Sequence, residues 1–251
     1  MKVLIPMAGA GSRFAQEGYT FPKPLIDVQG KPMIQKVVEN LDFDCEYIFL
    51  VRKEHMEKYS GILDTLDRIT NGNFRCVEVN GLTEGAACTA LLAQDFINND
   101  EDLLIANSDQ WIDYQPENFK ALKALTDVDA IVYTFNAVHP KWSFVKTNSR
   151  GFVTEVAEKK PISNIATCGI YWYRKGSDFV KYANQMIEKD IRVNNEFYIA
   201  PVYNELIADG KGLVPFYVNK MWGLGTPEDL RYFLNNNQRT PRVCTKATYI
   251  P

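Results

Sequence analysis

The sequence has few histidines, no paired cysteines and no long apolar run. Its two histidines, His55 and His139, are too few for a histidine metal cluster. Five cysteines are an odd number without short paired spacing, so neither a disulfide framework nor a zinc site is indicated. No apolar run approaches the length that crosses a bilayer. We also expect no secretory signal peptide, because Met1-Lys2 leads straight into a short strand. These absences favour a cytoplasmic protein without a membrane partner.

The chain also lacks an excess of charge of one sign. Its 28 basic and 31 acidic residues give a net charge of -3, so no basic footprint indicates a nucleic-acid partner. Hydrophobic residues make up 46% of the 251 positions, which is ample for a core, and the length suits one large α/β domain. Any phosphate must therefore be bound by local cations.

The N-terminal stretch offers such cations beside small residues. A buried-strand pattern at positions 3–6 breaks into a glycine loop, Arg13 follows, and Lys23 comes ten residues later. Glycines allow successive backbone N–H groups to approach a polyphosphate closely, while fixed cations neutralise its charge. The sequence therefore predicts an anion-binding loop. Its small residues are Ala8, Gly9, Ala10, Gly11 and Ser12.

Two familiar phosphate loops do not fit this stretch. A P-loop ends in Gly-Lys-Ser/Thr, but Gly11 is followed by Ser12-Arg13. A dinucleotide fingerprint needs a third glycine, where this chain has Phe14, and a helix straight after the turn. Gly18 and Pro22 disfavour a helix over positions 16–23. We expect a long, mobile loop that presents Lys23 between two prolines.

Apolar spacing predicts alternating strands and helices in the first half of the chain. This alternation indicates an α/β fold with a doubly wound, mixed but mainly parallel sheet flanked by helices. From about position 137 the strands are short and indicate an antiparallel addition. The expected strands are 47–51, 75–79, 102–109, 130–135, 143–146, 152–156 and 168–173, and the expected helices are 33–41, 56–66, 116–125, 179–187 and one marked by apolar residues from 199 to 207.

Two further stretches carry candidate site residues. Asp109 follows the strand that starts at position 102, and ligands of open α/β sheets bind outside such strand ends, so its carboxylate is well placed for a divalent ion. The alternative is an aspartate that caps the next turn. Positions 80–90 predict a strand, a glycine turn and an alanine-rich helix start, which could read the edge of a base or simply pack closely.

The loop motif Gly9-Ala10-Gly11-Ser12-Arg13, with Pro22-Lys23, resembles the sugar-nucleotide pyrophosphorylases. These nucleotidylyltransferases join a nucleoside triphosphate to a phosphorylated sugar or similar acceptor and release pyrophosphate. The segment 25–34 looks like the continuation of the family motif. The resemblance implies one Rossmann-like, glycosyltransferase-A-like domain over residues 1–251. Its nucleotide-binding half would be 1–136, its acceptor-binding half 137–234, and its irregular tail 235–251.

The resemblance also implies roles in the nucleotide-binding half. Asn80 and Gly85 would contact the base. Asp109 would bind Mg²⁺, Arg13 would hold the leaving phosphates, and Lys23 would bridge the α-phosphate and the incoming acceptor phosphate.

In the second half, the segment 155–161 looks like the Glu-Lys-Pro element of the family. Glu158 and Lys159 would then meet the hydroxyl groups and the phosphate of the acceptor, although Lys160 leaves the register open by one. A solvated charge run is the alternative. Gly169 would permit close approach of the acceptor. We expect Asn195 to cap a helix, and Glu196 is either a ligand or a charge at that helix start.

One position departs from the family pattern. Many members have a second metal-binding aspartate just before their Gly-Thr-Pro turn, and here Gly223 occupies that position. Glu196 could substitute for it, or one carboxylate with phosphates and waters could suffice.

Other functions stay open at this point. A glycosyltransferase of related fold would typically show Asp-x-Asp, which Ser108-Asp109-Gln110 lacks, and a nucleotide-binding regulator is suggested only by Gly223. The base, the acceptor and a homo-oligomeric state are also open. Trp142, Ser143 and Phe144 stand where hexose-binding relatives often have a small Tyr-Gly turn, which points to an unusual acceptor such as a capsule or surface-polysaccharide precursor.

Overall fold

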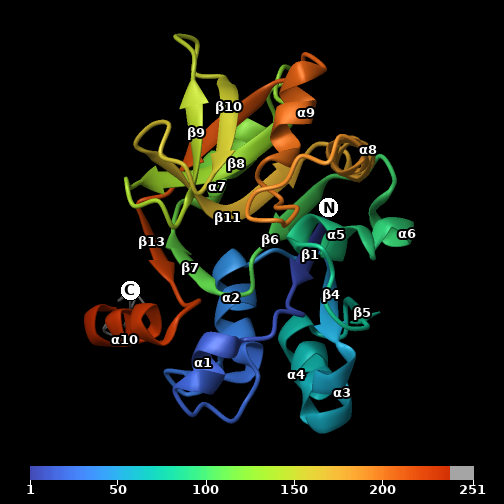
Figure 1. The fold of residues 1–251 in the computed structure, drawn as a ribbon, viewed down its shortest axis with the longest axis vertical. Helices are drawn as coiled ribbons and strands as arrows, with labels where there is room; N and C mark the ends of the chain where they lie inside the picture. The colour runs from blue at the N-terminus through green and yellow to red at the C-terminus, as the bar shows by residue number, and fades with distance from the viewer. Residues whose placement is uncertain (238–251) are drawn as a thin grey trace, which may run out of the picture.

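The computed structural model describes residues 1–237, and a nine-stranded sheet runs through it (Figure 1). One path through the sheet has the order β10-β9-β11-β6-β1-β4-β5, and β8 and β12 extend it beside β11. The strands are β1 (Lys2–Pro6), β4 (Glu46–Arg52), β5 (Phe74–Val79), β6 (Leu103–Ala106), β8 (Ala130–Asn136), β9 (Ser143–Thr147), β10 (Val153–Glu158), β11 (Ile165–Tyr173) and β12 (Leu213–Tyr217).

The first half of the chain forms the parallel part of the sheet. β1 lies between β4 and β6 and pairs parallel with both, and β4 pairs parallel with β5. The central strands are continuous apolar runs because both faces of a parallel sheet are covered by helices. The predicted doubly wound, mainly parallel arrangement is confirmed.

The second half adds antiparallel strands, as the short strand patterns predicted. β11 pairs antiparallel with β6, β8 and β9, and β10 pairs antiparallel with β9. β12, which the sequence did not reveal, pairs parallel with β8. The acceptor-binding half proposed from the sequence is therefore continuous with the first half through β6 and β11.

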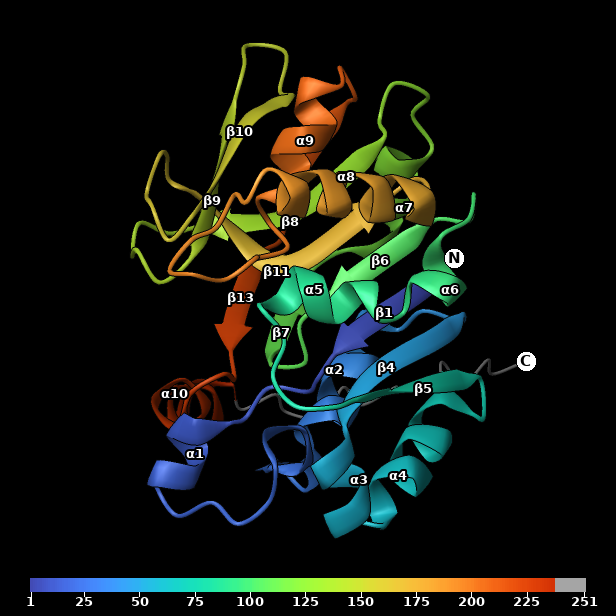
Figure 2. The same ribbon diagram turned by 45° about the vertical axis from the view of Figure 1, so that its right-hand side comes forward.

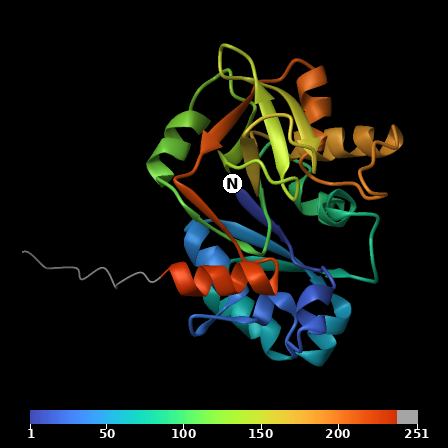
Figure 3. The ribbon, with the colours of Figure 1, turned by 60° about the vertical axis from the view of Figure 1, so that its left-hand side comes forward.

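Helices cover both faces of the sheet. Leu4 belongs to the core cluster under α5, α8 and α9, whereas its neighbours Val3 and Ile5 belong to the cluster under α2, α4 and α7. This alternation is the two-residue period of a strand. Figure 2 shows α5 and α8 on one face, and Figure 3 shows α7 on the other. The helices are α2 (Met33–Leu41), α3 (Lys53–Lys58), α4 (Gly61–Thr70), α5 (Ala86–Leu91), α6 (Gln94–Ile97), α7 (Pro116–Lys123), α8 (Gly176–Glu188) and α9 (Val202–Ala208).

A third, smaller core joins the N-terminal loop to the end of the described chain. In Figures 1 and 2, α10 (Pro227–Asn236) lies beside α1 (Ser12–Gln16). Phe14 of α1 packs with Leu230 and Phe233 of α10. Arg231 on α10 also pairs with Glu17 at 2.6 Å. The remaining short elements are β2 (Asp27–Val28), β3 (Lys31–Pro32), β7 (Gln110–Asp113), β13 (Lys220–Gly223) and the 3-10 turn η1 (Lys23–Leu25).

Several local predictions need correction. The single helix expected over 56–66 is two helices, α3 and α4, which Tyr59 and Ser60 separate. A five-residue helix, α1, follows Gly11 directly and includes position 16, and position 23 begins η1, so only positions 17–22 of the stretch expected to be non-helical are so. Asn195 does not cap a helix and Glu196 is not a helix-start charge, because α9 begins only at Val202.

The C-terminal boundary also differs from the prediction. α10 continues to Asn236, two residues into the tail expected from position 235, and positions 238–251 lie outside the described residues. None of the helices within residues 1–237 is both long enough and apolar enough to cross a membrane.

Candidate active site

Two cavities lie at the carboxyl ends of the parallel strands. The smaller, of about 280 Å³, is lined from the loop after β1, the turn after β5 and the connection after β6. The larger, of about 430 Å³, is lined by β9, β10 and β11, by the Asp109 connection and by the start of α10. Ala86, the first residue of α5, lines both cavities. The two cavities are therefore neighbours.

The smaller cavity contains part of the predicted nucleotide-binding set. Ala8, Gly9, Lys23, Gly85 and Glu196 line it. Sequence reasoning missed Thr83 and Thr89, whose hydroxyl groups lie 2.6 Å apart in the turn and helix beside it. Ala10, Gly11, Ser12 and Asn80 do not line either cavity, and Asn80 is exposed.

Gly85 has a structural reason to be glycine besides its place in the cavity. A Cβ there would lie 2.5 Å from both the backbone N and O of Phe197, and its φ is +132°. The flanking backbone is paired with the same segment, since Phe197 N–H donates to Glu84 O and Ala87 N–H donates to Phe197 O. The turn after β5 is thus fixed against the segment that carries Glu196.

Lys23 and Asp109 form an ion pair at the junction of the cavities. Lys23 Nζ donates to Asp109 Oδ2 at 2.8 Å, and both side chains are about three-quarters buried. Lys23 lines the smaller cavity and Asp109 the larger one. Lys23 begins η1 between Pro22 and Pro24. A Cβ on the left-handed Gly11, with φ +63°, would lie 3.5 Å from the Lys23 Cβ, so the glycine loop runs beside Lys23. Asp109 lies after β6, in the connection to β7.

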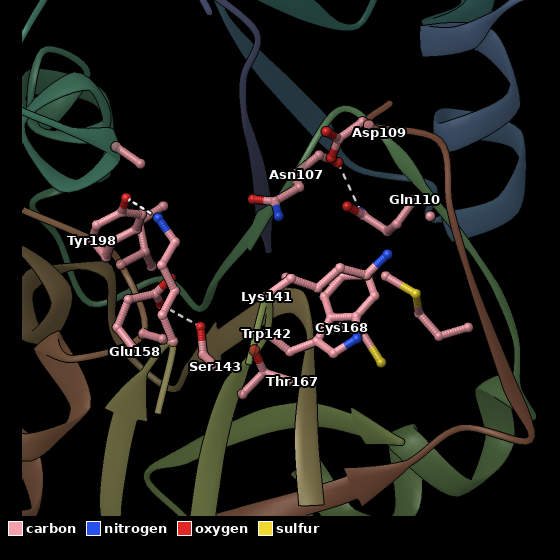
Figure 4. A pocket seen from close by; sticks show the side chains of 18 of the residues that line it. Asn107, Asp109, Gln110, Lys141, Trp142, Ser143, Glu158, Thr167, Cys168 and Tyr198 are labelled. Carbon is pink, nitrogen blue, oxygen red and sulfur yellow. Dashed lines mark hydrogen bonds between the residues drawn. The ribbon is translucent and has the colours of Figure 1, made fainter. Parts of the chain in front are cut away.

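The walls of the larger cavity come from both halves of the chain. In Figure 4, Glu158, Ser143 and Tyr198 lie on one side and Lys141 and Trp142 on another, with Asn107, Asp109 and Gln110 beyond them. Arg13 also lines this cavity and has no ion-pair partner among residues 1–237. The cavity thus combines cations, carboxyl groups and an aromatic wall.

Glu158 is a largely buried carboxyl group of this cavity. It accepts a short hydrogen bond from the Ser143 hydroxyl. Burial raises the pKa of Glu158 above its ordinary value, while the Ser143 hydrogen bond and the charge of Lys159 oppose that rise. Such a carboxyl group can recognise hydroxyl groups of a ligand as acceptor or, when protonated, as donor.

Lys159 follows Glu158 in an unusual backbone conformation. Its φ is +54°, which is uncommon for a residue with a side chain, and its N–H donates to Trp142 O. Its ammonium donates to the Tyr198 hydroxyl and lies 4.4 Å from the centroid of that ring. Both residues line the larger cavity, whereas Lys160 does not. This placement favours Lys159 in the register that the sequence left open.

Gly169 lines the larger cavity, but its neighbour is a side chain of this protein. A Cβ at Gly169 would lie 2.1 Å from Asn107 Nδ2, and the Asn107 N–H donates to Gly169 O at 2.9 Å. Gly169, with φ +76°, therefore makes room for Asn107, which itself lines the cavity. Asn107 lies two residues before Asp109. The signal in the sequence that could have indicated Asn107 as a site residue is its place among the polar residues that follow an apolar strand.

The turn between β13 and α10 closes the cavity beside Asp109. β13 pairs antiparallel with β7, and Leu224 N–H donates to Asp109 O at 2.8 Å. Gly225 leaves space for the carboxylate, because a Cβ there would lie 2.6 Å from Asp109 Oδ2. A Cβ at Gly223 would instead make ordinary contact, at 3.4 Å, with the carboxylate of Asp229.

The donor set for a metal ion is limited. No cluster of three or more His, Cys, Asp or Glu side chains suited to a metal occurs in the described part of the chain. Asp109, in the space left by Gly225, offers a carboxylate to the junction. Mg²⁺ is commonly held by one or two carboxylates together with substrate phosphates and waters, so this set fits a nucleotide-bound Mg²⁺.

Sequence comparison relates the chain to curated proteins, one of which is named as a nucleotidyltransferase. It is 26% identical over 234 residues to the bifunctional protein GlmU of Methanocaldococcus jannaschii, covering 92% of this chain and 52% of that protein. It is 25% identical over 248 residues to the low-salt glycan biosynthesis nucleotidyltransferase Agl11 of Haloferax volcanii, covering 92% of this chain and 64% of that protein. The chain spans about half the length of the GlmU relatives.

Solved structures share the fold. A nucleoside-diphosphate-sugar pyrophosphorylase from Vibrio cholerae RC9 superposes with a TM-score of 0.78 at 24% identity, over 93% of this chain and 99% of that one. A putative glucose-1-phosphate thymidylyltransferase from Bacillus anthracis superposes with a TM-score of 0.73 at 19% identity, over 94% of each chain.

A family model fits nearly all of the described chain. The model of the nucleotidyl transferase family matches residues 2–239, which include the glycine loop, the Lys23–Asp109 junction and both cavities. With the mixed sheet and the paired cavities, this match makes the chain a member of the nucleotidyl transferase family.

Proposed function

We propose that this protein transfers a nucleoside monophosphate from a nucleoside triphosphate to a sugar phosphate or a similar phosphorylated acceptor and releases pyrophosphate. The nucleotide would occupy the smaller cavity and the acceptor the larger one. The observation that carries this proposal is the Lys23–Asp109 pair, whose members line different cavities and are 2.8 Å apart. A group that must contact both substrates belongs at such a junction.

The reaction requires positioning and charge stabilisation more than acid–base chemistry. An oxygen of the acceptor phosphate attacks the α-phosphorus in line, a new P–O bond forms, and the bond to the β-phosphate oxygen breaks. The nucleophile is already an anion, so no general base is needed. Lys23 would contact the α-phosphate and the incoming phosphate, and Arg13 would hold the departing pyrophosphate.

On the acceptor side, Lys159 would orient the acceptor phosphate and Glu158 would bind acceptor hydroxyl groups. Asp109 would hold a Mg²⁺ ion, which supplies neutralisation of the phosphate charge when bound. The contact between Asp109 and Lys23 would then loosen, which would free the Lys23 ammonium for the phosphates. Gly85, Glu196 and the Thr83–Thr89 pair line the smaller cavity and would select the base or ribose.

The names of the relatives support a wider role for the reaction. Agl11 is named for glycan biosynthesis, and solved relatives are named as sugar-nucleotide pyrophosphorylases, so nucleotide-sugar synthesis for a surface glycan is the role we propose. We place the reaction in the cytoplasm because nucleoside triphosphates are made there and the four cysteines within residues 1–237 are free thiols.

A substrate panel tests this function. Pyrophosphate release would be measured with Mg²⁺ from each of CTP, UTP, dTTP, GTP and ATP against sugar phosphates and small phosphorylated alcohols. The expected result is release with one base and one acceptor class. Release of free nucleoside diphosphate from a nucleotide sugar would favour the glycosyltransferase alternative, and nucleotide binding without turnover on any acceptor would favour the regulator.

A further inference from the structure

We propose that Lys141 and Asp229 form a specificity subsite that selects an acceptor with an uncharged, hydroxyl-bearing ring. This inference rests on the proposed function. The two residues form an ion pair of 2.9 Å between Lys141 Nζ and Asp229 Oδ1, and both line the larger cavity. Neither has a role in the phosphoryl-transfer chemistry described above.

The position of the pair is fixed from several sides. Asp229 Oδ2 accepts from the Thr226 hydroxyl at 2.8 Å, and the Asp229 N–H donates back to that hydroxyl, so the carboxylate is anchored to the first turn of α10. The Lys141 ammonium lies 4.6 Å from the centroid of the Trp142 ring. Trp142 is in turn held edge-to-face against Phe135. Figure 4 shows Lys141 and Trp142 together in the wall of the cavity.

The glycine at position 223 is part of the same arrangement. With no side chain there, the Asp229 carboxylate lies beside the backbone, 3.4 Å from where a Cβ would stand. The carboxylate at this point of the cavity therefore comes from the helix α10 and not from the strand β13. This carboxylate is neutralised by a lysine, which suits recognition of a neutral group.

The chemistry of a balanced pair favours hydroxyl groups. The ammonium has three N–H groups and uses one for Asp229, so others can donate to a ligand oxygen, while the carboxylate retains lone pairs for a ligand O–H. Neighbouring hydroxyls of a sugar ring can both accept from the lysine and donate to the aspartate. The apolar edge of Trp142 offers a surface for the ring carbons.

The same pair works against charged acceptors. A carboxylate on the ring would be repelled by Asp229 and an ammonium by Lys141, and a charged group that approached the oppositely charged end would have to compete with the ion pair already formed there. The two side chains are 44% and 26% exposed, so the interaction is partly screened and the discrimination is moderate. Removing one partner should unmask the charge of the other.

The test compares three acceptors in single-residue variants. With the preferred nucleotide and Mg²⁺, kcat/KM is measured for a hexose 1-phosphate, a hexuronic acid 1-phosphate and an amino-hexose 1-phosphate. Asp229→Asn leaves the positive charge of Lys141 unbalanced, and Lys141→Met leaves the negative charge of Asp229 unbalanced. Lys181→Met is the matched control, because Lys181 forms a 2.7 Å ion pair with Asp209 and lines neither cavity.

The wild-type protein should prefer the neutral hexose phosphate. Asp229→Asn should raise the hexuronate-to-hexose ratio of kcat/KM about tenfold, equivalent to about 1.4 kcal/mol, and Lys141→Met should raise the amino-hexose ratio by a similar factor. KM for the nucleotide should stay unchanged in both variants, and the Lys181→Met control should match the wild type on all three acceptors.

Four results would overturn the inference in distinguishable ways. A wild-type preference for a charged acceptor contradicts the selection of a neutral ring. Equal loss on all three acceptors in both variants assigns the pair a structural role only. Absence of pyrophosphate from the wild-type protein with every acceptor contradicts the transferase itself, whereas turnover with unchanged ratios contradicts only the subsite.

Discussion

Replacing Gly225 by alanine should move the Asp109 carboxylate while leaving the stability of the fold nearly unchanged. The added Cβ would lie 2.6 Å from Asp109 Oδ2, the same oxygen that accepts from Lys23. Restoring an ordinary contact of 3.4 Å requires the carboxylate to move by about 0.8 Å. The 2.8 Å contact with Lys23 would then stretch or turn out of line.

The expected effect is on turnover. A displacement of about 1 Å at a reacting group can lower the reaction rate roughly 10²-fold, so kcat for Gly225→Ala should fall by about that factor. The melting temperature should change little, because the clash is with the end of a partly exposed side chain that can rotate. Pyrophosphate release and thermal unfolding are measured on the same preparations.

Gly223→Ala is the matched control in the same turn. Its added Cβ meets the Asp229 carboxylate at 3.4 Å, an ordinary contact, so this variant should stay within about threefold of the wild type, a change of less than 1 kcal/mol. Equal activity of Gly225→Ala and Gly223→Ala would refute the placement of Asp109 in the reaction. A large fall in melting temperature for Gly225→Ala alone would mean that the turn, and not the carboxylate, is the sensitive element.

Three other predictions follow from single contacts. Lys23→Ala should lower kcat by about 10²–10³-fold, roughly 3–4 kcal/mol, with nucleotide binding by calorimetry largely kept; activity within a few-fold of the wild type would contradict its role. Gly85→Ala should lower the free energy of unfolding, measured in urea, by about 2 kcal/mol or more, because the added Cβ clashes with the Phe197 backbone. At Gly81 no atom lies within 4 Å of an added Cβ, so Gly81→Ala should cost only the strain of its left-handed backbone, about 1–2 kcal/mol. The raised pKa of Glu158 means that the folded protein holds the Glu158 proton more tightly than the unfolded chain does. The protonated Glu158 therefore contributes stability below about pH 4.5, and this contribution is lost as pH rises through the folded-state pKa. Glu158→Gln should remove this decline from urea titrations across that pH window, and an unchanged decline would contradict the assignment.

The sequence predicted the elements whose signal is local. The apolar run of β4 and the glycine loop with Arg13 and Lys23 need only their own residues to be recognised, and the family resemblance supplied Asp109. The short ribbon of β7 and β13 escaped prediction because each strand has four residues and pairs with a partner more than a hundred positions away. Its periodicity is too brief to distinguish a strand from a loop.

The candidate site was predicted less completely than the fold, also for physical reasons. Lys141 and Asp229 are 88 positions apart, and no local pattern reports an ion pair formed by tertiary packing. Tyr198 and Glu196 lie in an irregular segment that the sequence suggested was the start of a helix. Gly85 and Gly169 were expected beside ligands, and both line cavities, but their missing side chains make room for Phe197 and Asn107 of the protein itself.

The most direct measurement follows a radioactive α-phosphate through the reaction. The protein, Mg²⁺, the preferred nucleoside triphosphate labelled at its α-phosphorus and a sugar phosphate would be incubated together, and the products separated. The predicted result is label in the nucleotide sugar with one unlabelled pyrophosphate formed for each labelled product, lost on Lys23→Ala. Label that remains in the triphosphate, or that appears only as free nucleoside monophosphate, would contradict transfer between the two cavities.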